Sequence, residues 1–260
     1  MLHRIEERTW SRRPEASPAR GPARVLNLKE RSRFMLIADA IQKSPIRHLG
    51  TDPKTMLQPG RFGAVVAEPG MGKTSLLVQL GLYALLNENP VLHISLNDPV
   101  HKVSLWYKEL FRHFVRKYAV EVAADVWEAV QCRRFIMTFQ VEGFSVPKLR
   151  ERLTDITEQG IFTPSILMID GLRFDEGISE TLEAMAALCE AMRWSAWFTA
   201  AGTPEAKAVL KNDPFDVVLG LRMEEKTVRI SMEKGSGSPV DLCLDTDTML
   251  IQPFVGEVRA

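Results

Sequence analysis

Short apolar runs alternate with longer helical patterns from about residue 62 to residue 221. The runs are of strand length, and turn-forming or polar residues flank them. They predict strands at Phe62–Val66, Val91–Leu96, Arg134–Phe139, Ser165–Ile169, Ser195–Ala200 and Val217–Leu221. Further on, Thr227–Glu233 and Val240–Leu244 flank the segment KGSGSP, which predicts a hairpin.

The segments between these strands carry apolar residues at helical spacing. They predict helices at Thr74–Leu86, Val100–Tyr118, Ser145–Gln159 and Ser179–Met192, with a short helix at Phe34–Ile41 before the first strand. Ser145 is a candidate N-cap, and Pro147 falls in the first turn. Alternating strands and helices predict an α/β fold: a mainly parallel twisted sheet flanked by helices, with antiparallel C-terminal strands.

Composition adds few constraints. The chain is 45% hydrophobic and 25% charged, as in ordinary globular proteins. No apolar run reaches the roughly 18 residues that span a bilayer, so we expect no membrane segment. Its three cysteines, Cys132, Cys189 and Cys243, are too widely spaced for a zinc or disulfide pattern. We expect buried thiols and a cytoplasmic location.

Positive charge gathers at the N-terminus, although the formal net charge of the chain is zero. Residues 1–33 hold nine Lys or Arg against four Glu, together with three prolines and few large apolar side chains. This composition predicts a flexible basic tail over residues 1–43, followed by a folded domain over residues 44–260.

A candidate phosphate-binding loop, AEPGMGKTS, joins the first predicted strand to the helix after it. The usual pattern is GxxxxGK followed by Ser or Thr, and here Ala67 stands at the first position. Lys73 would reach the outer phosphates of ATP, Thr74 would bind Mg²⁺, and the helix would point its N-terminus at the anion. The predicted nucleotide-binding residues of this loop are Glu68, Pro69, Gly70, Met71, Gly72, Lys73, Thr74 and Ser75.

An apolar strand that ends in a carboxylate supports a magnesium–nucleotide site. The segment ILMID is an apolar strand that ends in Asp170, about 100 residues after the loop. A carboxylate in this position can hold Mg²⁺ beside the phosphates. We therefore predict Thr74 and Asp170 as the metal-binding residues. The strand ending at Val66 is expected to be central and next to the strand ending at Asp170.

The order of these motifs resembles the RecA-like core of DnaB-type hexameric replicative helicases and their plasmid and phage relatives. The matching segments are MLQPGRFGAVVAEPGMGKTSL, PVLHISLNDP, ILMIDGLRF, ISETLEAMAALCEAM and RISMEKGSG. The resemblance runs from about Leu57 to Phe254 and is clearest in its first half. It implies a RecA-like P-loop NTPase that binds ATP and Mg²⁺, handles DNA and forms homo-oligomers. The family's loop also commonly begins with Ala, which accounts for Ala67.

Three positions depart from the pattern that the resemblance implies for hydrolysis. Asn97, with Asp98 beside it, stands where the family has the Glu that polarises water. Ala200 stands at the position of the Gln that senses the γ-phosphate. In the late hairpin Lys234 matches the family's Lys, but Ser236 replaces its Arg. The candidate catalytic residues are therefore Asn97, Asp98 and Lys234, and we expect ATP binding with slow hydrolysis.

Partners and purpose stay open at the level of sequence. The segment from His101 to Tyr118 mixes basic and aromatic residues, which suits either a DNA-binding or acidic-protein surface or an amphipathic helix with its aromatics in the core. The basic tail could likewise bind phosphates or be a solvated extension. Two functional classes follow, an active DNA-dependent motor and a nucleotide-bound regulatory scaffold.

Overall fold

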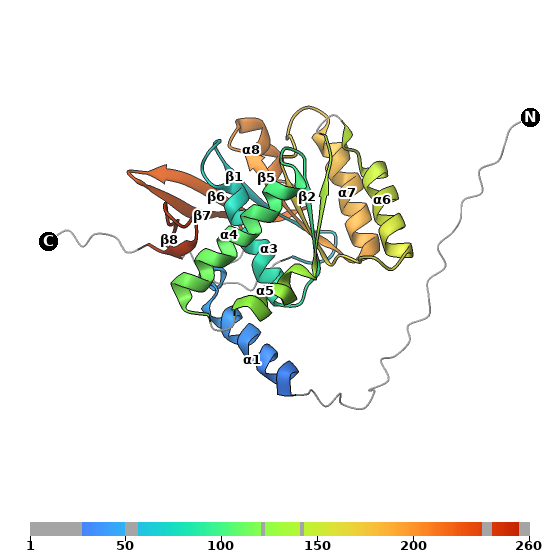
Figure 1. Ribbon diagram of the computed structural model, residues 1–260. Helices are drawn as coiled ribbons and strands as arrows, with labels where there is room; N and C mark the ends of the chain where they lie inside the picture. The colour runs from blue at the N-terminus through green and yellow to red at the C-terminus, as the bar shows by residue number, and fades with distance from the viewer. Residues whose placement is uncertain (1–27, 50–56, 121–122, 141–142, 236–240, 255–260) are drawn as a thin grey trace, which may run out of the picture.

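A nine-stranded sheet forms the centre of the described structure (Figure 1). The computed structural model describes residues 28–49, 57–120, 123–140, 143–235 and 241–254. Its strands are β1 (Phe62–Ala67), β2 (Val91–Ser95), β3 (Arg134–Thr138), β4 (Ile166–Asp170), β5 (Ser195–Ala201), β6 (Phe215–Glu224), β7 (Thr227–Lys234), β8 (Leu242–Leu244) and β9 (Ile251–Pro253). Its helices are α1 (Leu28–Lys43), the 3₁₀ helix η1 (Pro45–Leu49), α3 (Lys73–Leu86), α4 (Val100–Tyr118), α5 (Ala123–Gln131), α6 (Val146–Glu158), α7 (Ile178–Met192) and α8 (Pro204–Leu210).

The sheet has a parallel part and an antiparallel part. The spatial order is β3-β2-β4-β5-β1-β6-β7-β8-β9. Neighbours from β3 to β6 pair in parallel, and those from β6 to β9 pair antiparallel. The predicted α/β class, with a mostly parallel sheet and antiparallel C-terminal strands, is therefore confirmed.

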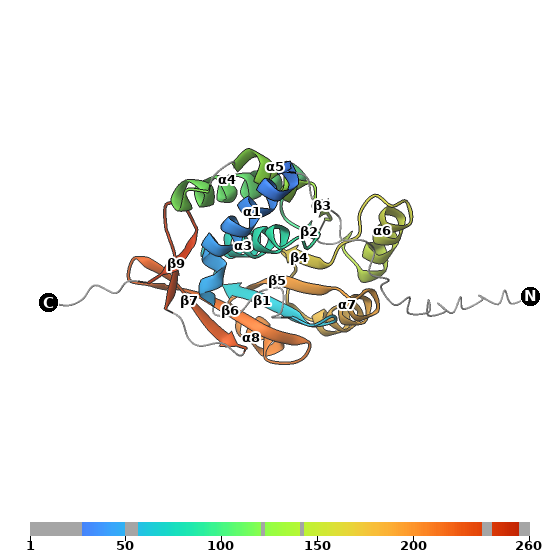
Figure 2. The same ribbon diagram turned by 90° about the horizontal axis from the view of Figure 1, so that it is seen from below.

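Two hydrophobic cores form because successive strand residues point to opposite faces of the sheet. In β1, Val65 and Ala67 face the core built with α1, α3, α4 and α5, whereas Ala64 and Val66 face the core built with α6, α7 and α8. Figure 2 shows these two groups of helices on opposite sides of the sheet. Helix α3 is almost wholly apolar because other helices cover its outer side, and all its residues from Ser75 to Leu86 are buried.

One expected neighbour relation is wrong. The sequence suggested that the strand of the phosphate loop lies next to the strand ending at Asp170. Instead β5 lies between β1 and β4 and pairs in parallel with both. Parallel strands end at the same edge, and two strand spacings are only about 10 Å. A side chain from the α3 end of the loop can therefore still reach Asp170.

Most predicted elements agree with the structure to within a few residues. Helix α4 has the predicted bounds, and Ser145 caps α6 by accepting a hydrogen bond from the backbone nitrogen of Lys148. The predicted hairpin is present as the β7–β8 pair, although β7 also pairs with β6. Helices α5 and α8 and strand β9 were missed because their patterns are short.

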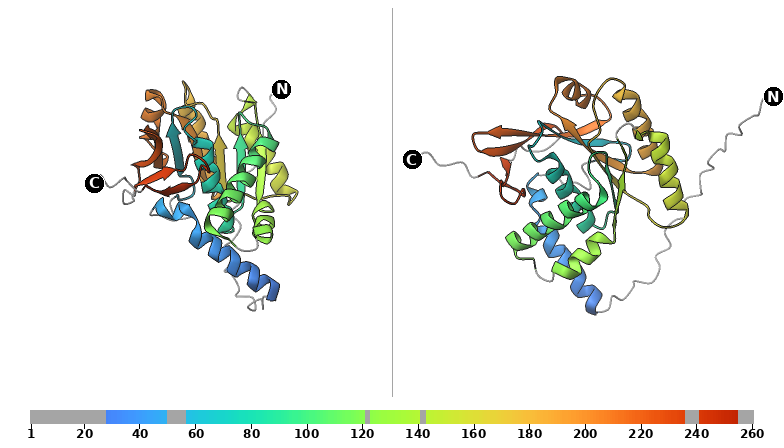
Figure 3. Two further views of the ribbon diagram at one scale, coloured as in Figure 1. Left: turned by 60° about the vertical axis from the view of Figure 1, so that its left-hand side comes forward. Right: turned by 45° about the horizontal axis from the view of Figure 1, so that its top comes forward.

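Helix α1 begins earlier than the predicted domain boundary at residue 43. It runs from Leu28 to Lys43, with Ile37 and Ala40 buried, and contacts α3 and α5. Figure 3 shows α1 on the outer side of the helix layer that contains α3 and α5. The predicted tail therefore contains a helix in residues 28–43, and residues 1–27 lie outside the described residues.

A buried polar cluster lies between β2, β3 and α4. His93 is fully buried, and its Nδ1 lies 3.2 Å from the hydroxyl of Tyr107. The guanidinium of Arg134 stacks 4.5 Å from the centre of the Tyr107 ring. Burial, with the positive charge of Arg134, lowers the pKa of His93 to about 3. His93 is therefore neutral in the folded protein at physiological pH.

We expect this histidine to make the fold acid-sensitive. Unfolded His93 takes up a proton near pH 6.5 and the folded residue only near pH 3, so stability is lost as pH falls through this window. The contribution of His93 to the pH dependence of the free energy of unfolding should approach roughly 1.4 kcal/mol per pH unit. Urea unfolding of His93→Gln should show a weaker dependence between pH 7 and pH 5, whereas His101→Gln, at an exposed position, should match wild type. A wild-type slope in His93→Gln would contradict this account.

Candidate functional site

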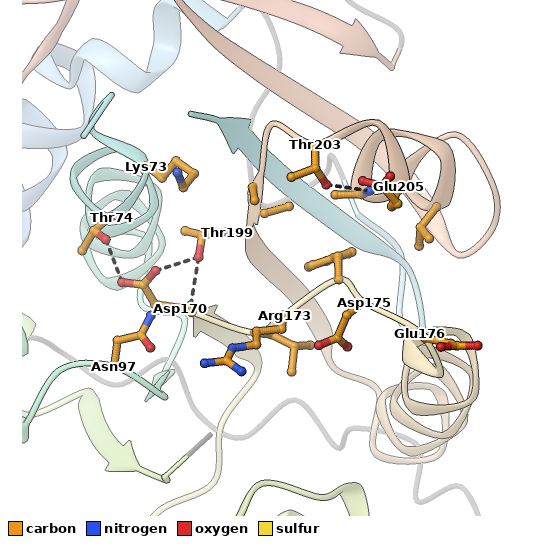
Figure 4. Close-up of a pocket in the computed structure, with 17 residues that line it drawn as sticks. Lys73, Thr74, Asn97, Asp170, Arg173, Asp175, Glu176, Thr199, Thr203 and Glu205 are labelled. Atoms are coloured by element: carbon orange, nitrogen blue, oxygen red, sulfur yellow. Dashed lines mark hydrogen bonds between the residues drawn. The ribbon is translucent and has the colours of Figure 1, made fainter. Parts of the chain in front are cut away.

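A pocket of about 810 Å³ opens at the carboxyl edge of β1, β4 and β5 (Figure 4). Four of the residues singled out from the sequence line it: Lys73, Thr74, Asn97 and Asp170. The open carboxyl edge of a parallel sheet is the usual ligand site of such folds. The fold thus brings Lys73 and Thr74 of the loop into one pocket with Asp170 of the acidic strand and with Asn97, which follows β2.

The loop before α3 depends on two glycines with left-handed backbone conformations. Gly70 has φ +81° and Gly72 has φ +89°, values that side-chain-bearing residues rarely adopt. A Cβ atom on Gly70 would meet nothing within 4 Å, so the inner side of the turn is open. A Cβ on Gly72 would lie 2.7 Å from the Met249 side chain, so the C-terminal segment packs closely on this turn.

Lys73 is held against its own loop. Its Nζ donates to the carbonyl oxygens of Ala67 at 2.7 Å and Glu68 at 3.0 Å. Burial lowers the pKa of the Lys73 ammonium, while the charges of Asp170 and Glu68 oppose that shift. The ammonium group therefore lies at the mouth of the turn with only uncharged hydrogen-bond partners.

A chain of hydroxyl and carboxylate groups links the strands β4 and β5 to α3. Thr74 Oγ1 donates to Asp170 Oδ2 at 2.8 Å, and Thr199 Oγ1 donates to Asp170 Oδ1 at 2.7 Å. Burial raises the pKa of the Asp170 carboxyl, and the hydrogen bonds from Thr199 and Thr74 counteract it. The hydroxyl of Thr74 and the carboxylate of Asp170 are thus in direct contact. Oxygen atoms of this kind are the ligands that Mg²⁺ prefers.

Thr199 was not identified as a site residue from the sequence. Besides its bond to Asp170, its hydroxyl accepts from the backbone nitrogen of Gly171 at 3.0 Å. It thereby fixes both the carboxylate and the start of the loop after β4. The signal that could have identified Thr199 is its polar side chain in a strand of otherwise mostly apolar residues, since a buried hydroxyl needs a hydrogen-bond partner. Ala200, one residue further, also lines the pocket.

Asn97 and Asp98 follow β2 but take different directions. Asn97 lines the pocket and lies against Gly171, where a Cβ would come within 2.2 Å of the Asn97 amide nitrogen. Asp98 instead accepts from Lys102 Nζ at 2.8 Å, and its backbone nitrogen donates to Ser95 Oγ. Asp98 does not line the pocket, although its charge helps raise the pKa of Asp170. Of the two neighbouring residues predicted to be catalytic, Asn97 therefore lines the pocket and Asp98 lies outside it.

Lys234 lies outside this pocket within the described chain. Its Nζ donates to the carbonyl oxygens of Lys211 at 2.9 Å and Asn212 at 3.2 Å, beyond the end of α8. A catalytic contact of Lys234 with the site of its own chain is therefore not formed in this structure. Ser236 lies outside the described residues.

The other predicted loop residues surround the turn. Glu68, Pro69 and Gly70 are exposed, and Met71 is half-buried against the core. Ser75 Oγ donates to the carbonyl oxygen of Met249 at 2.9 Å, so it anchors the C-terminal segment to α3. Only Lys73 and Thr74 of this loop reach the pocket beside Asp170.

The far side of the pocket was not predicted. It is formed by the loop between β4 and α7 and by the start of α8. Its charged members are Arg173, Asp175, Glu176 and Glu205. They follow strand ends, which is the signal that could have indicated them, but their direction depends on the turns at Gly171 and Gly202.

Helix α4 confirms the amphipathic interpretation of residues 101–118. Tyr107, Phe111 and Phe114 are buried in the core. On the outer side, Lys102 pairs with Asp98 and Arg112 pairs with Glu109. Lys117 lies 3.7 Å from Asp245. The exposed positive charge of this face is therefore partly neutralised.

No protein-family model matches the chain, and the search of curated proteins finds no match. Among the described residues, no group of three or more His, Cys, Asp or Glu side chains could hold a metal ion. None of the described helices is long and apolar enough to cross a bilayer. Cys189 and Cys243 are buried as expected, whereas Cys132 is exposed.

Proposed function

We propose that the protein is a RecA-like P-loop NTPase that binds Mg-ATP and hydrolyses it slowly, as a nucleotide-dependent module in DNA-related processes. The observation that carries the proposal is the 2.8 Å contact between Thr74 Oγ1 and Asp170 Oδ2, with Lys73 lining the same pocket. The AEPGMGKTS loop precedes these groups. This combination suits a bound triphosphate and its metal better than any other ligand class.

The residues present suit the two ligands. Gly70 and Gly72 keep the turn free of side-chain bulk, so that backbone N–H groups can surround phosphate oxygens. Lys73 would exchange its carbonyl partners for the outer phosphates. Thr74 and Asp170 would hold Mg²⁺, whose other positions are usually filled by water and phosphate oxygens. When bound, the metal would neutralise phosphate charge.

Slow hydrolysis follows from the group at position 97. Asn97 can hydrogen-bond a water molecule but cannot accept its proton, and Asp98 is bonded to Lys102 outside the pocket. Asp175, Glu176 and Glu205 lie across the pocket from Asp170 in Figure 4. Among the described residues, Asp170 is the carboxylate that bonds to Thr74, and Glu68, whose charge acts on Lys73, does not line the pocket. This arrangement favours holding ATP over rapid turnover.

An active DNA-dependent motor is the second candidate. It is favoured by Lys108 and Arg116, which are exposed on α4 and form no ion pair or hydrogen bond with the other described residues. Such free cations can bind phosphate groups of nucleic acid. The pairing of Lys102, Arg112 and Lys117 weakens this face as a DNA-binding surface.

Thermal unfolding with nucleotide tests the proposal. Mg-ATP at about 100 times its Kd should stabilise the folded state by about 2.7 kcal/mol. For a chain of this size this corresponds to a rise in Tm of about 5–10 °C. The same ATP concentration with excess chelator should give a smaller rise, and the absence of any shift with Mg-ATP would contradict nucleotide binding. ATP turnover measured in parallel with and without DNA separates the two candidates. Stimulation by DNA of tenfold or more would favour the DNA-dependent motor over the slowly hydrolysing module.

A further inference from the structure

A second cation lines the candidate phosphate pocket opposite the loop. Arg173 lies on the segment between β4 and α7, three residues after Asp170. The segment is bounded by Gly171 and Gly177, with φ +88° and +87°. Asn97 packs against the first of these turns, and the residues from Leu172 to Glu176 that follow it line the pocket. In Figure 4 the Arg173 guanidinium points toward Asn97, on the side of the pocket where Asp170 lies.

The donors of the Arg173 side chain have no partner in the part of the chain that the structure describes. The side chain is exposed, and it forms no hydrogen bond or ion pair with any other described residue. Asp175 and Glu176 line the same pocket, yet neither pairs with it. Lys73, by contrast, is bonded to two carbonyl groups. Arg173 is therefore the cation of this pocket, within the described chain, whose donors are all available to a ligand.

The charges around the pocket limit where a polyanion can lie. Its lining includes four carboxylates, on Asp170, Asp175, Glu176 and Glu205, against the two cations Lys73 and Arg173. A triphosphate is repelled by Asp175, Glu176 and Glu205 and attracted to the space that Lys73 and the Arg173 guanidinium border. A guanidinium is also suited to this role because its planar donors can bind two phosphate oxygens at once.

We propose that Arg173 binds the terminal phosphate of the nucleoside triphosphate held by the same chain. This inference rests on the proposed function. It makes discrimination between ATP and ADP a property of the single chain, because the terminal phosphate is the group that reaches beyond Lys73 toward Arg173. No arginine from a neighbouring subunit is then needed to recognise the triphosphate.

Binding of a non-hydrolysable ATP analogue and of ADP, both with Mg²⁺, tests this inference. Arg173→Gln should weaken the analogue by about 10- to 100-fold, since a hydrogen bond to a charged group is lost. ADP binding should change by less than about threefold, because the contacted phosphate is missing. Arg173→Lys should recover part of the affinity for the analogue that Arg173→Gln loses, because lysine keeps the positive charge but lacks the two parallel donors of arginine.

Arg150→Gln provides the matched control, because Arg150 is an exposed arginine on α6 that does not line the pocket. It should leave both ligands unchanged. Unchanged analogue binding in Arg173→Gln, or an equal loss for analogue and ADP, would overturn the assignment while leaving the proposed function intact. Wild-type protein that binds neither ligand would overturn both. A wild-type ATP-to-ADP preference that appears only at high protein concentration would show that a neighbouring chain supplies the recognition.

Discussion

Replacing Lys73 with alanine should weaken ATP binding at least about 30-fold while leaving the affinity for adenosine nearly unchanged. The ammonium group is partly buried beside Asp170 and would face the outer phosphates. Removing one member of a desolvated charge pair costs about 2–5 kcal/mol, and 1.4 kcal/mol is a tenfold change in Kd. Adenosine has no phosphate, so its binding does not depend on this charge. Titration calorimetry with both ligands measures the difference.

Lys108→Ala is a matched control for this experiment. Lys108 is exposed on α4 and lies outside the pocket. The variant should bind ATP like wild type. Because Lys73 also donates to Ala67 and Glu68, the unfolding midpoint of Lys73→Ala without ligand should be measured to confirm that it folds. An equal loss for ATP and adenosine, or no loss for either, would argue against a phosphate role for Lys73.

Asn97→Glu should raise ATP turnover at least about tenfold above wild type. Asn97 lines the pocket with Thr74 and Asp170, so a longer carboxylate there can reach a water molecule near the terminal phosphate. A well-placed general base contributes typically 10²–10⁴-fold to rate, and imperfect placement should retain part of that. Steady-state release of phosphate under saturating Mg-ATP is the measurement.

Asn97→Gln separates charge from length in this experiment. Glutamine has the size of glutamate but cannot accept the proton, so its rate should remain at the wild-type level. Equal rates for Asn97→Glu and Asn97→Gln would indicate that position 97 does not place the water. Rapid wild-type turnover that survives Asn97→Ala would show that another residue supplies the base, and the carboxylates across the pocket would be the candidates.

Local patterns predicted most of the helices and strands of this protein. The bounds of α4, the cap at Ser145 and the turn formed by Gly70 and Gly72 follow from residues close together in sequence. Helical spacing, capping side chains and left-handed glycines act within one or two turns of chain, which is why sequence alone could predict them. The pairing of the loop with Asp170 was also predictable, since parallel strands end at one edge of their sheet.

Only the tertiary structure decided how the strands are ordered and which side chains meet. Placement of β5 between β1 and β4 brings Thr199 onto Asp170, and the turn at Gly171 directs Arg173 into the pocket. Lys234 bonds to carbonyl groups beyond α8 instead of reaching the site of its own chain. These contacts join residues far apart in sequence. They depend on how two cores pack against opposite faces of one sheet, and no local pattern encodes that packing.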